Sequence, residues 1–146
     1  IARARRIAWI AGAVTFVSIG SIATFIAVFP DLWVDIFTGD AKVRAASRQY
    51  LATAAPMYAF LGLSLSMYFS SQGAAKVLGP VLAQTARLFF IAVGGWWLST
   101  HDASAGSFYV LAAISMVMLG ALASASVLFT RWGPKRISVP ERPAMS

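Results

Sequence analysis

The chain has 146 residues, of which 12% are charged and 59% are hydrophobic, and its mean hydropathy is +0.73. An ordinary soluble domain carries about 25% charged residues, so this composition excludes a soluble globular domain, a disordered chain and a collagen-like chain. The net charge of +7 does not indicate nucleic-acid binding, because the basic residues form short clusters between long uncharged runs. The absence of cysteine excludes disulfides and thiolate metal sites. The solvent that suits such a surface is lipid.

Four long runs with almost no charge predict an all-α integral membrane protein. The uncharged runs cover residues 7–30, 49–75 and 103–130, and a further run at 79–98 contains one charge, Arg87. Because a helix rises 1.5 Å per residue, about 20 residues cross a hydrocarbon core of roughly 30 Å. We therefore expect four transmembrane helices, over about 7–29, 48–70, 79–98 and 107–129. Barrel strands would alternate over about ten residues, and these runs do not.

The distribution of lysine and arginine predicts which side of the membrane each loop occupies. With four crossings, the N-terminus, the 71–78 loop and the C-terminus share one side. Basic residues accumulate in cytoplasmic loops, so the side with more of them is expected to be cytoplasmic, which places both termini there. That side carries Arg3, Arg5, Arg6, Lys76, Arg131, Lys135, Arg136 and Arg142, against Lys42, Arg44 and Arg48 on the other side.

The segment between the first two spans predicts a short interfacial helix. Four apolar residues follow a helical period there, with Asp31 and Asp35 on the opposite face, and Gly39 ends the pattern. Asp40 is then placed to cap the next helix, its carboxylate accepting from the N–H groups of residues 42 and 43. The four apolar residues are Leu32, Trp33, Ile36 and Phe37.

Prolines mark three further features. Pro56 lies inside the second span and frees the carbonyl of Ala52, which predicts a kink. Pro80 suits the start of the third helix, where a missing N–H does no harm. The last segment, 131–146, contains three prolines and no apolar period, so we expect a disordered cytoplasmic tail after a membrane domain at 1–130.

Arg87 is the most informative residue of the spans, because a charge at that depth costs about 2.5–3.5 kcal/mol on insertion scales and should face protein or water. Arg87 belongs to a series of five residues whose successive spacings of 4, 3, 4 and 3 place them on one face of a helix. This stripe combines polar and small residues, as an inward face would. Three roles stay open: a residue on a substrate pathway, a brace between helices, or a side chain that snorkels to the surface. The stripe consists of Pro80, Gln84, Arg87, Ile91 and Gly94.

No catalytic constellation is present, so we do not expect an enzyme, a metal site or a cofactor. The single histidine, His101, lies beside Asp102 in a loop, and nothing else in the chain would complete a triad or a zinc site. Serine and threonine in membrane helices are more often packing groups than ligands. Gly120 and Ser124 form a small-xxx-small pair that suits close packing of the fourth helix.

Several residues in this order resemble the multidrug and toxic compound extrusion (MATE) family. A Leu/Ile-Phe-Thr-x-Asp-x-x-Val pattern followed by Tyr-Leu precedes the second helix of that family, and an Ala/Ser-x-Gln-Gly-Ala pattern, a short turn and a proline follow it. An arginine seven residues past the proline is also similar. In this chain the positions are Ile36, Phe37, Thr38, Asp40, Val43, Tyr50, Leu51, Ser70, Gln72, Gly73, Ala74, Pro80 and Arg87.

The resemblance implies the last four helices of a twelve-helix transporter, with 1–130 as part of its second six-helix lobe and an N-terminal lobe of the same chain missing. It implies export of small organic, often cationic, compounds through the bacterial cytoplasmic (inner) membrane by alternating access, coupled to H⁺ or Na⁺. The candidate pathway or cavity residues are Arg87, Gln84, Tyr58, Ser66 and Met57, and the cytoplasmic loop motif comprises Gln72, Gly73 and Pro80.

Two departures from the family pattern bear on the mechanism. A Gly-Asp-Thr sequence common in the family is replaced here by Ala75, Lys76 and Val77. Sodium-coupled members carry a carboxylate on the helix that corresponds to 48–70, and this chain has none there, which argues against sodium coupling through these helices.

Two other functions remain open from the sequence. A lipid-linked saccharide flippase of the same superfamily would need several intramembrane basic residues to bind a lipid phosphate, and this chain offers one. A four-helix membrane scaffold without transport activity would need none.

Overall fold

The computed structural model describes residues 2–130, which are helical apart from short turns. The helices are α1 (Ala2–Val28), α2 (Asp31–Phe37), α3 (Ala41–Ala54), the 3-10 turn η1 (Ala55–Met57), α4 (Tyr58–Gly73), α5 (Leu78–Thr100) and α6 (Ala105–Phe129). Four helical stretches are long and apolar enough to cross a membrane: Arg3–Val28, Ala41–Gly73, Leu78–Thr100 and Ala105–Phe129. The predicted all-α architecture with four spans is thus confirmed. The predicted tail at 131–146 lies outside the described residues.

The second span differs most from its prediction, because it begins at Ala41 rather than near residue 48. The Asp40 carboxylate accepts from Lys42 N at 2.7 Å and Val43 N at 3.3 Å, as expected, and this cap starts the helix before the uncharged run begins. At Pro56 the helix tightens into η1, which confirms the predicted irregularity. Pro80 is the third residue of α5, within its first turn.

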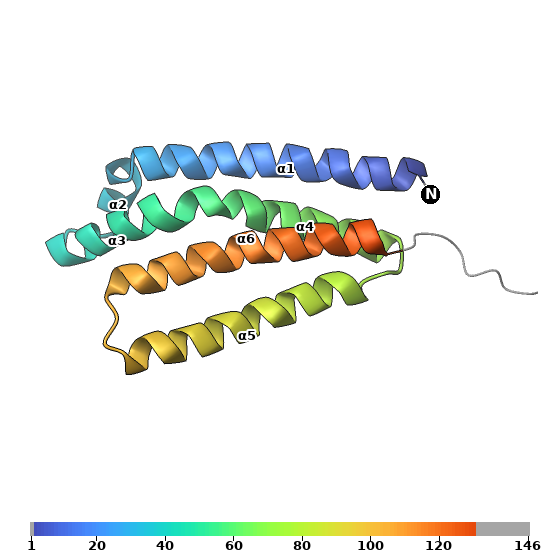
Figure 1. The fold of residues 1–146 in the computed structure, drawn as a ribbon. Helices are drawn as coiled ribbons and strands as arrows, with labels where there is room; N and C mark the ends of the chain where they lie inside the picture. The colour runs from blue at the N-terminus through green and yellow to red at the C-terminus, as the bar shows by residue number, and fades with distance from the viewer. Residues whose placement is uncertain (1, 131–146) are drawn as a thin grey trace, which may run out of the picture.

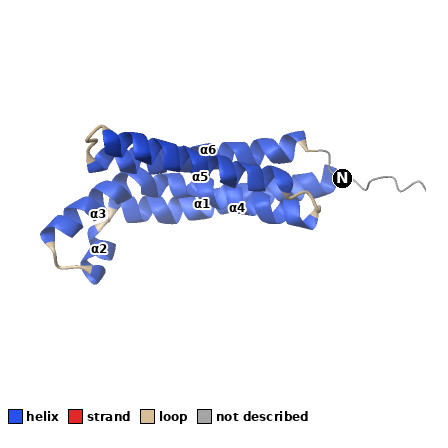
Figure 2. Cartoon of the chain, turned by 90° about the horizontal axis from the view of Figure 1, so that it is seen from below, coloured by secondary structure: helices blue, strands red, loops and turns tan. Residues whose placement is uncertain are grey.

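The long helices form a row rather than a closed bundle (Figure 1). α1 packs on α4, α4 packs on α6, and α6 packs on α5, so α1 and α5 are the outer members. Figure 2 shows the same helices running along one another, with the short α2 and the start of α3 projecting at one end. The beginning of α1 and the end of α6 lie at the other end, in agreement with an even number of crossings.

The tightest packing lies where α1, α4 and α6 meet. Ala8, Met67, Ala123 and Val127 are buried there, with Trp9 packed against them. Elsewhere small residues allow close approach: a Cβ added at Gly120 would lie 3.0 Å from the backbone oxygen of Phe60. This confirms the predicted packing role of Gly120, while the outer surface carries large apolar side chains that suit lipid.

Arg5 joins the first helix to the end of the last. Its guanidinium donates to the carbonyl of Val127 at 3.0 Å, and also to the carbonyls of Leu128 and Thr130. These carbonyls belong to the C-terminal turn of α6, which has no intrahelical donors left for them and carries the negative end of the helix dipole. One cation therefore closes α6 and fixes α1 beside it.

Candidate functional site

Three tyrosines gather at the end of the row where α3 meets α6. The hydroxyls of Tyr50 and Tyr58 lie 3.0 Å apart, and the ring of Tyr50 packs edge-on against that of Tyr109, with 5.5 Å between centroids. Tyr50 comes from α3, Tyr58 from the first turn of α4 and Tyr109 from α6. The turn at Pro56 sets the angle between the helices that carry the first two.

Two grooves open beside this tyrosine cluster and share Trp33, Tyr50 and Leu51. One, of about 260 Å³, lies between α1, α2, α3 and η1 and is lined mainly by isoleucines, with Tyr58 at its edge. The other, of about 600 Å³, lies between α2, α3 and α6 and includes Tyr109. Grooves of this kind suit an apolar or aromatic body, and their ring faces also attract a cation.

A third groove, of about 590 Å³, lies between α3, α5 and α6. It combines the polar side chains of Gln49 and Thr53 with apolar groups such as Leu111 and Ile114. Gly94 also lines it, two turns beyond Arg87 on the same side of α5. The groove thus opens along the face of α5 that carries the membrane-depth charge.

Arg87 is half-buried and faces α6. Its Nε donates to the hydroxyl oxygen of Ser115 at 3.3 Å, and that hydroxyl in turn donates to the carbonyl of Ala112 at 2.7 Å. Ser115 is fully buried. Arg87 therefore braces α5 against α6 in this structure.

The inward stripe predicted for α5 is confirmed in part. Pro80 is buried, Arg87 faces α6, and a Cβ added at Gly94 would meet the side chain of Leu111 at 2.7 Å. Gln84 is instead exposed, and Ala83, 4% exposed, takes the buried position. Successive residues of a helix are about 100° apart, so residues 83 and 84 cannot both face inward, and here the smaller one does.

None of the other predicted pathway residues is hydrogen-bonded to Arg87, whose partner within residues 2–130 is Ser115. Tyr58 belongs to the tyrosine cluster, and Met57, just before it, is half-buried in η1. Ser66 is half-buried two turns further along α4. The structure thus joins Tyr58 to Tyr50 and Arg87 to Ser115 by hydrogen bonds, and Arg87 lies near enough to the tyrosine pair for its charge to act on Tyr50.

The predicted loop motif forms the turn from α4 to α5. Gln72 and Gly73 are exposed at the end of α4. The N–H of Ala75 bonds to the carbonyl of Gln72 and the N–H of Lys76 to that of Ser71, both at 2.9 Å, which is a Schellman cap. Ala75 occupies its left-handed position, with φ of 53°.

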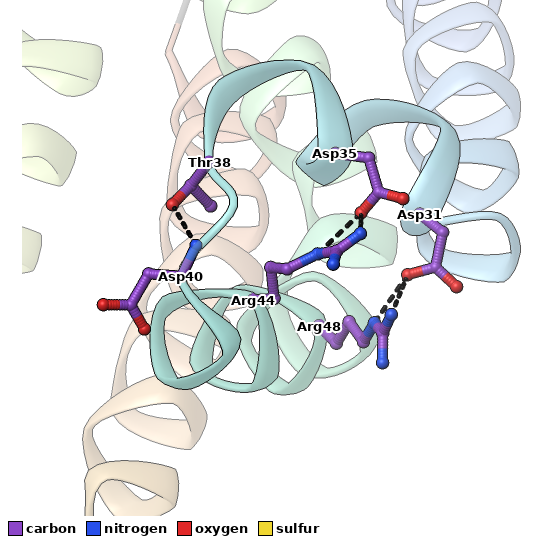
Figure 3. A network of polar contacts seen from close by, with 6 residues as sticks. All are labelled: Asp31, Asp35, Thr38, Asp40, Arg44 and Arg48. Atoms are coloured by element: carbon purple, nitrogen blue, oxygen red, sulfur yellow. Dashed lines mark hydrogen bonds and ion pairs between the residues drawn. The ribbon is translucent and has the colours of Figure 1, made fainter.

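The short helix α2 is held to α3 by two ion pairs that the sequence did not indicate (Figure 3). Arg48 pairs with Asp31, with Nε 2.5 Å from the carboxylate oxygen, and Arg44 pairs with Asp35, with Nε at 2.8 Å. In the turn between the helices, the N–H of Asp40 donates to the hydroxyl of Thr38. The predicted apolar residues of α2 stay 50–72% exposed, although Trp33 and Phe37 line the groove against α3 and α6.

Sequence reasoning missed Ser115, Tyr109 and Arg5 as functional or bracing positions. Ser115 lies in an apolar run among other small residues, and only the packing of α5 shows that it meets Arg87. Arg5 counted as one of several basic loop residues. The signal that could have found Tyr109 is its aromatic ring near a helix end, but that pattern also suits a lipid interface.

The remaining chemistry of the described part is sparse. His101 is exposed at the end of α5, where its ring stacks on that of Trp97 with 4.4 Å between centroids. Among residues 2–130, no three His, Asp or Glu side chains lie together as a metal site would require.

Comparisons with known proteins give no relative from which a function could be taken. No protein-family model matches the chain, and no curated protein or solved structure matches it either.

Proposed function

We propose that this chain is part of a secondary active multidrug efflux antiporter, which exports organic, often cationic, compounds by alternating access. The observation that carries the proposal is the third groove, between α3, α5 and α6, which combines apolar and hydrogen-bonding groups and includes Gly94, on the same side of α5 as Arg87. Such a groove suits amphipathic compounds, because it combines apolar area with a few hydrogen-bonding groups. The order of the sequence motifs supports the same proposal.

The open row of helices also supports a transporter lobe rather than a self-contained bundle. α5 has a neighbour chiefly on one side, α6, so further helices can complete a cavity against it. The 3-10 turn at Pro56 interrupts the second span, and such an interruption suits a lobe that changes shape between inward and outward states.

The coupling ion is expected to act outside these helices. The four acids among residues 2–130 are Asp31, Asp35, Asp40 and Asp102, and all of them lie outside the four membrane-spanning stretches. Carboxylates at membrane depth are the groups that commonly mark proton and ion pathways, and these spans contain none. Coupling would therefore depend on residues of the remainder of the transporter.

The test is efflux of a fluorescent organic cation such as ethidium from proteoliposomes that contain the protein encoded by the full gene. An imposed proton gradient or sodium gradient should drive transport. Arg87→Ala should reduce the rate, and Leu88→Ala, an exposed neighbour on α5, should leave it unchanged. Lack of transport with either gradient, in protein shown to be folded, would contradict the proposal.

A further inference from the structure

Arg87 has far fewer contacts than a guanidinium at membrane depth needs. It is the tenth residue of the 23-residue α5, so it lies roughly 14 Å from the start of the helix and roughly 20 Å from its end. Its one hydrogen bond within residues 2–130 joins Nε to Ser115. A guanidinium carries five N–H donors and stays protonated in proteins, so the described chain leaves most of this donor group without an acceptor.

The surface around Arg87 is also unusual for a lipid-facing helix. Buried residues make up only 6% of the most apolar stretch of α5, against 39% for α6. Nevertheless α5 has a lower hydropathy than α1 or α6. Gln84 and Thr85, one turn or less from Arg87, are exposed on it. An unsatisfied amide in hydrocarbon costs several kcal/mol, so this side of α5 requires a polar neighbour.

We propose that a further transmembrane helix carrying an aspartate or glutamate packs against the open side of α5, and that its carboxylate pairs with Arg87. A carboxylate accepts two parallel N–H bonds from a guanidinium, which matches the donors that Ser115 leaves free. The positive charge of Arg87 therefore favours a helix with a carboxylate as the neighbour of this side of α5. The inference does not depend on transport, because a non-transporting assembly would need the same pair.

Two other occupants fit the geometry less well. A second copy of this chain cannot supply the carboxylate at this depth, because its acids within residues 2–130 lie outside the four spans, and Glu141 follows the last span. A lipid phosphate lies at the headgroup level, roughly 15 Å from the bilayer centre, and Arg87 is two residues from the middle of α5. A helix is the carrier that presents an anion at this depth.

The first experiment is photo-crosslinking within the natural full-length protein in its own membrane. A photoreactive amino acid replaces Gln84, one turn from Arg87, and Phe89 serves as the matched control because it is 71% exposed on another face of α5. Mass spectrometry of the product from position 84 should identify a membrane-spanning segment that contains Asp or Glu. Products confined to lipid, to another copy of this chain or to a segment without an acid would overturn the proposal.

The second experiment is a charge swap, because a single variant of Arg87 can simply fail to fold. Arg87→Glu should lower the amount of folded protein about tenfold, since it opposes two carboxylates at membrane depth. Replacing the identified acid by Arg in the same protein should restore the amount to within about twofold. The proposed ion pair would be refuted if the double variant gave no more folded protein than Arg87→Glu alone. It would also be refuted if Arg87→Glu were as abundant as the parent protein. The readout is assembly, so loss of efflux in a restored variant would count against the proposed function only.

Discussion

The last two helices make an instructive comparison, because α5 and α6 have similar lengths and opposite degrees of burial. Buried residues make up 39% of the central stretch of α6, including Ala113, Ser115, Leu119 and Gly120, but only 6% of that of α5. The more apolar helix is thus the buried one. In lipid, apolar surface does not drive helices together; close packing of small residues does.

A polar residue is buried between helices on α6, but two are exposed on α5. On α6, the Ser115 hydroxyl is fully buried and satisfied by a carbonyl of its own helix and by Arg87. On α5, Gln84 and Thr85 lie on an exposed side. The polar group of α6 that meets Arg87 is thus satisfied within this chain, whereas the polar side chain of Gln84 on α5 is exposed.

The largest expected effect comes from breaking the packed side at Gly120. A Cβ there would meet the backbone oxygen of Phe60 at 3.0 Å, and a backbone cannot move aside as a side chain can. Gly120→Ala should therefore destabilise the protein by about 1–3 kcal/mol. Gly95→Ala on α5 is the matched control, because no atom lies within 4 Å of the added methyl group. Thermal unfolding in detergent measures both; equal losses would show that α5 and α6 are packed alike.

A smaller loss is expected when the link between α1 and α6 is removed. Arg5→Ala deletes the donors to the carbonyls of Val127 and Thr130, and a hydrogen bond to a charged group contributes about 1.5–3 kcal/mol, less when it is partly exposed. Hydrogen exchange at the end of α6 should accelerate. Arg3→Ala, at an exposed position, is the control and should leave that exchange unchanged.

A gain of up to about 1 kcal/mol is expected at the turn that connects the packed and open sides. Ala75 has φ of 53°, which costs a residue with a Cβ and costs glycine nothing, so Ala75→Gly should raise the unfolding temperature. Ala74→Gly, at φ of −91°, should not. A lower unfolding temperature for Ala75→Gly would contradict the left-handed assignment.

The smallest effect is expected at the exposed ion pairs between α2 and α3. Asp35→Ala and Arg44→Ala should each give a slight loss that the double variant does not increase, because both remove one pair. In about 1 M salt the Debye length falls to about 3 Å, and the difference from the parent should vanish. Additive losses in a double-mutant cycle would exclude the pair as a stabilising contact.

Local features of the fold followed from single residues of the sequence. Asp40 capped α3 on the two predicted N–H groups, because a cap depends on neighbours two and three residues away. Pro56 tightened its helix for an equally local reason. The cap at Asp40 placed the start of α3 correctly, but the predicted span began seven residues later, because counting uncharged residues ignores a helix that begins among charges.

The candidate site was less predictable, because its contacts join distant parts of the chain. Arg87 was found from its charge alone, but its partner Ser115 is 28 residues away and is one of many small residues of α6. Gln84 was expected to face inward, and a helical period cannot distinguish it from Ala83 until α6 selects one of them. The tyrosine pair Tyr50 and Tyr58 required the bend at Pro56.

The sequence by itself therefore determined the apolar character of the surface, the number of spans and the cap of α3, because hydropathy, charge and proline act within a few residues. The tertiary structure decided the order of the helices in the row, the burial of α6 rather than α5, and the brace between Arg87 and Ser115. The physical reason is that helices in lipid choose neighbours by shape and by a few polar contacts, and neither is written in the hydropathy of one helix.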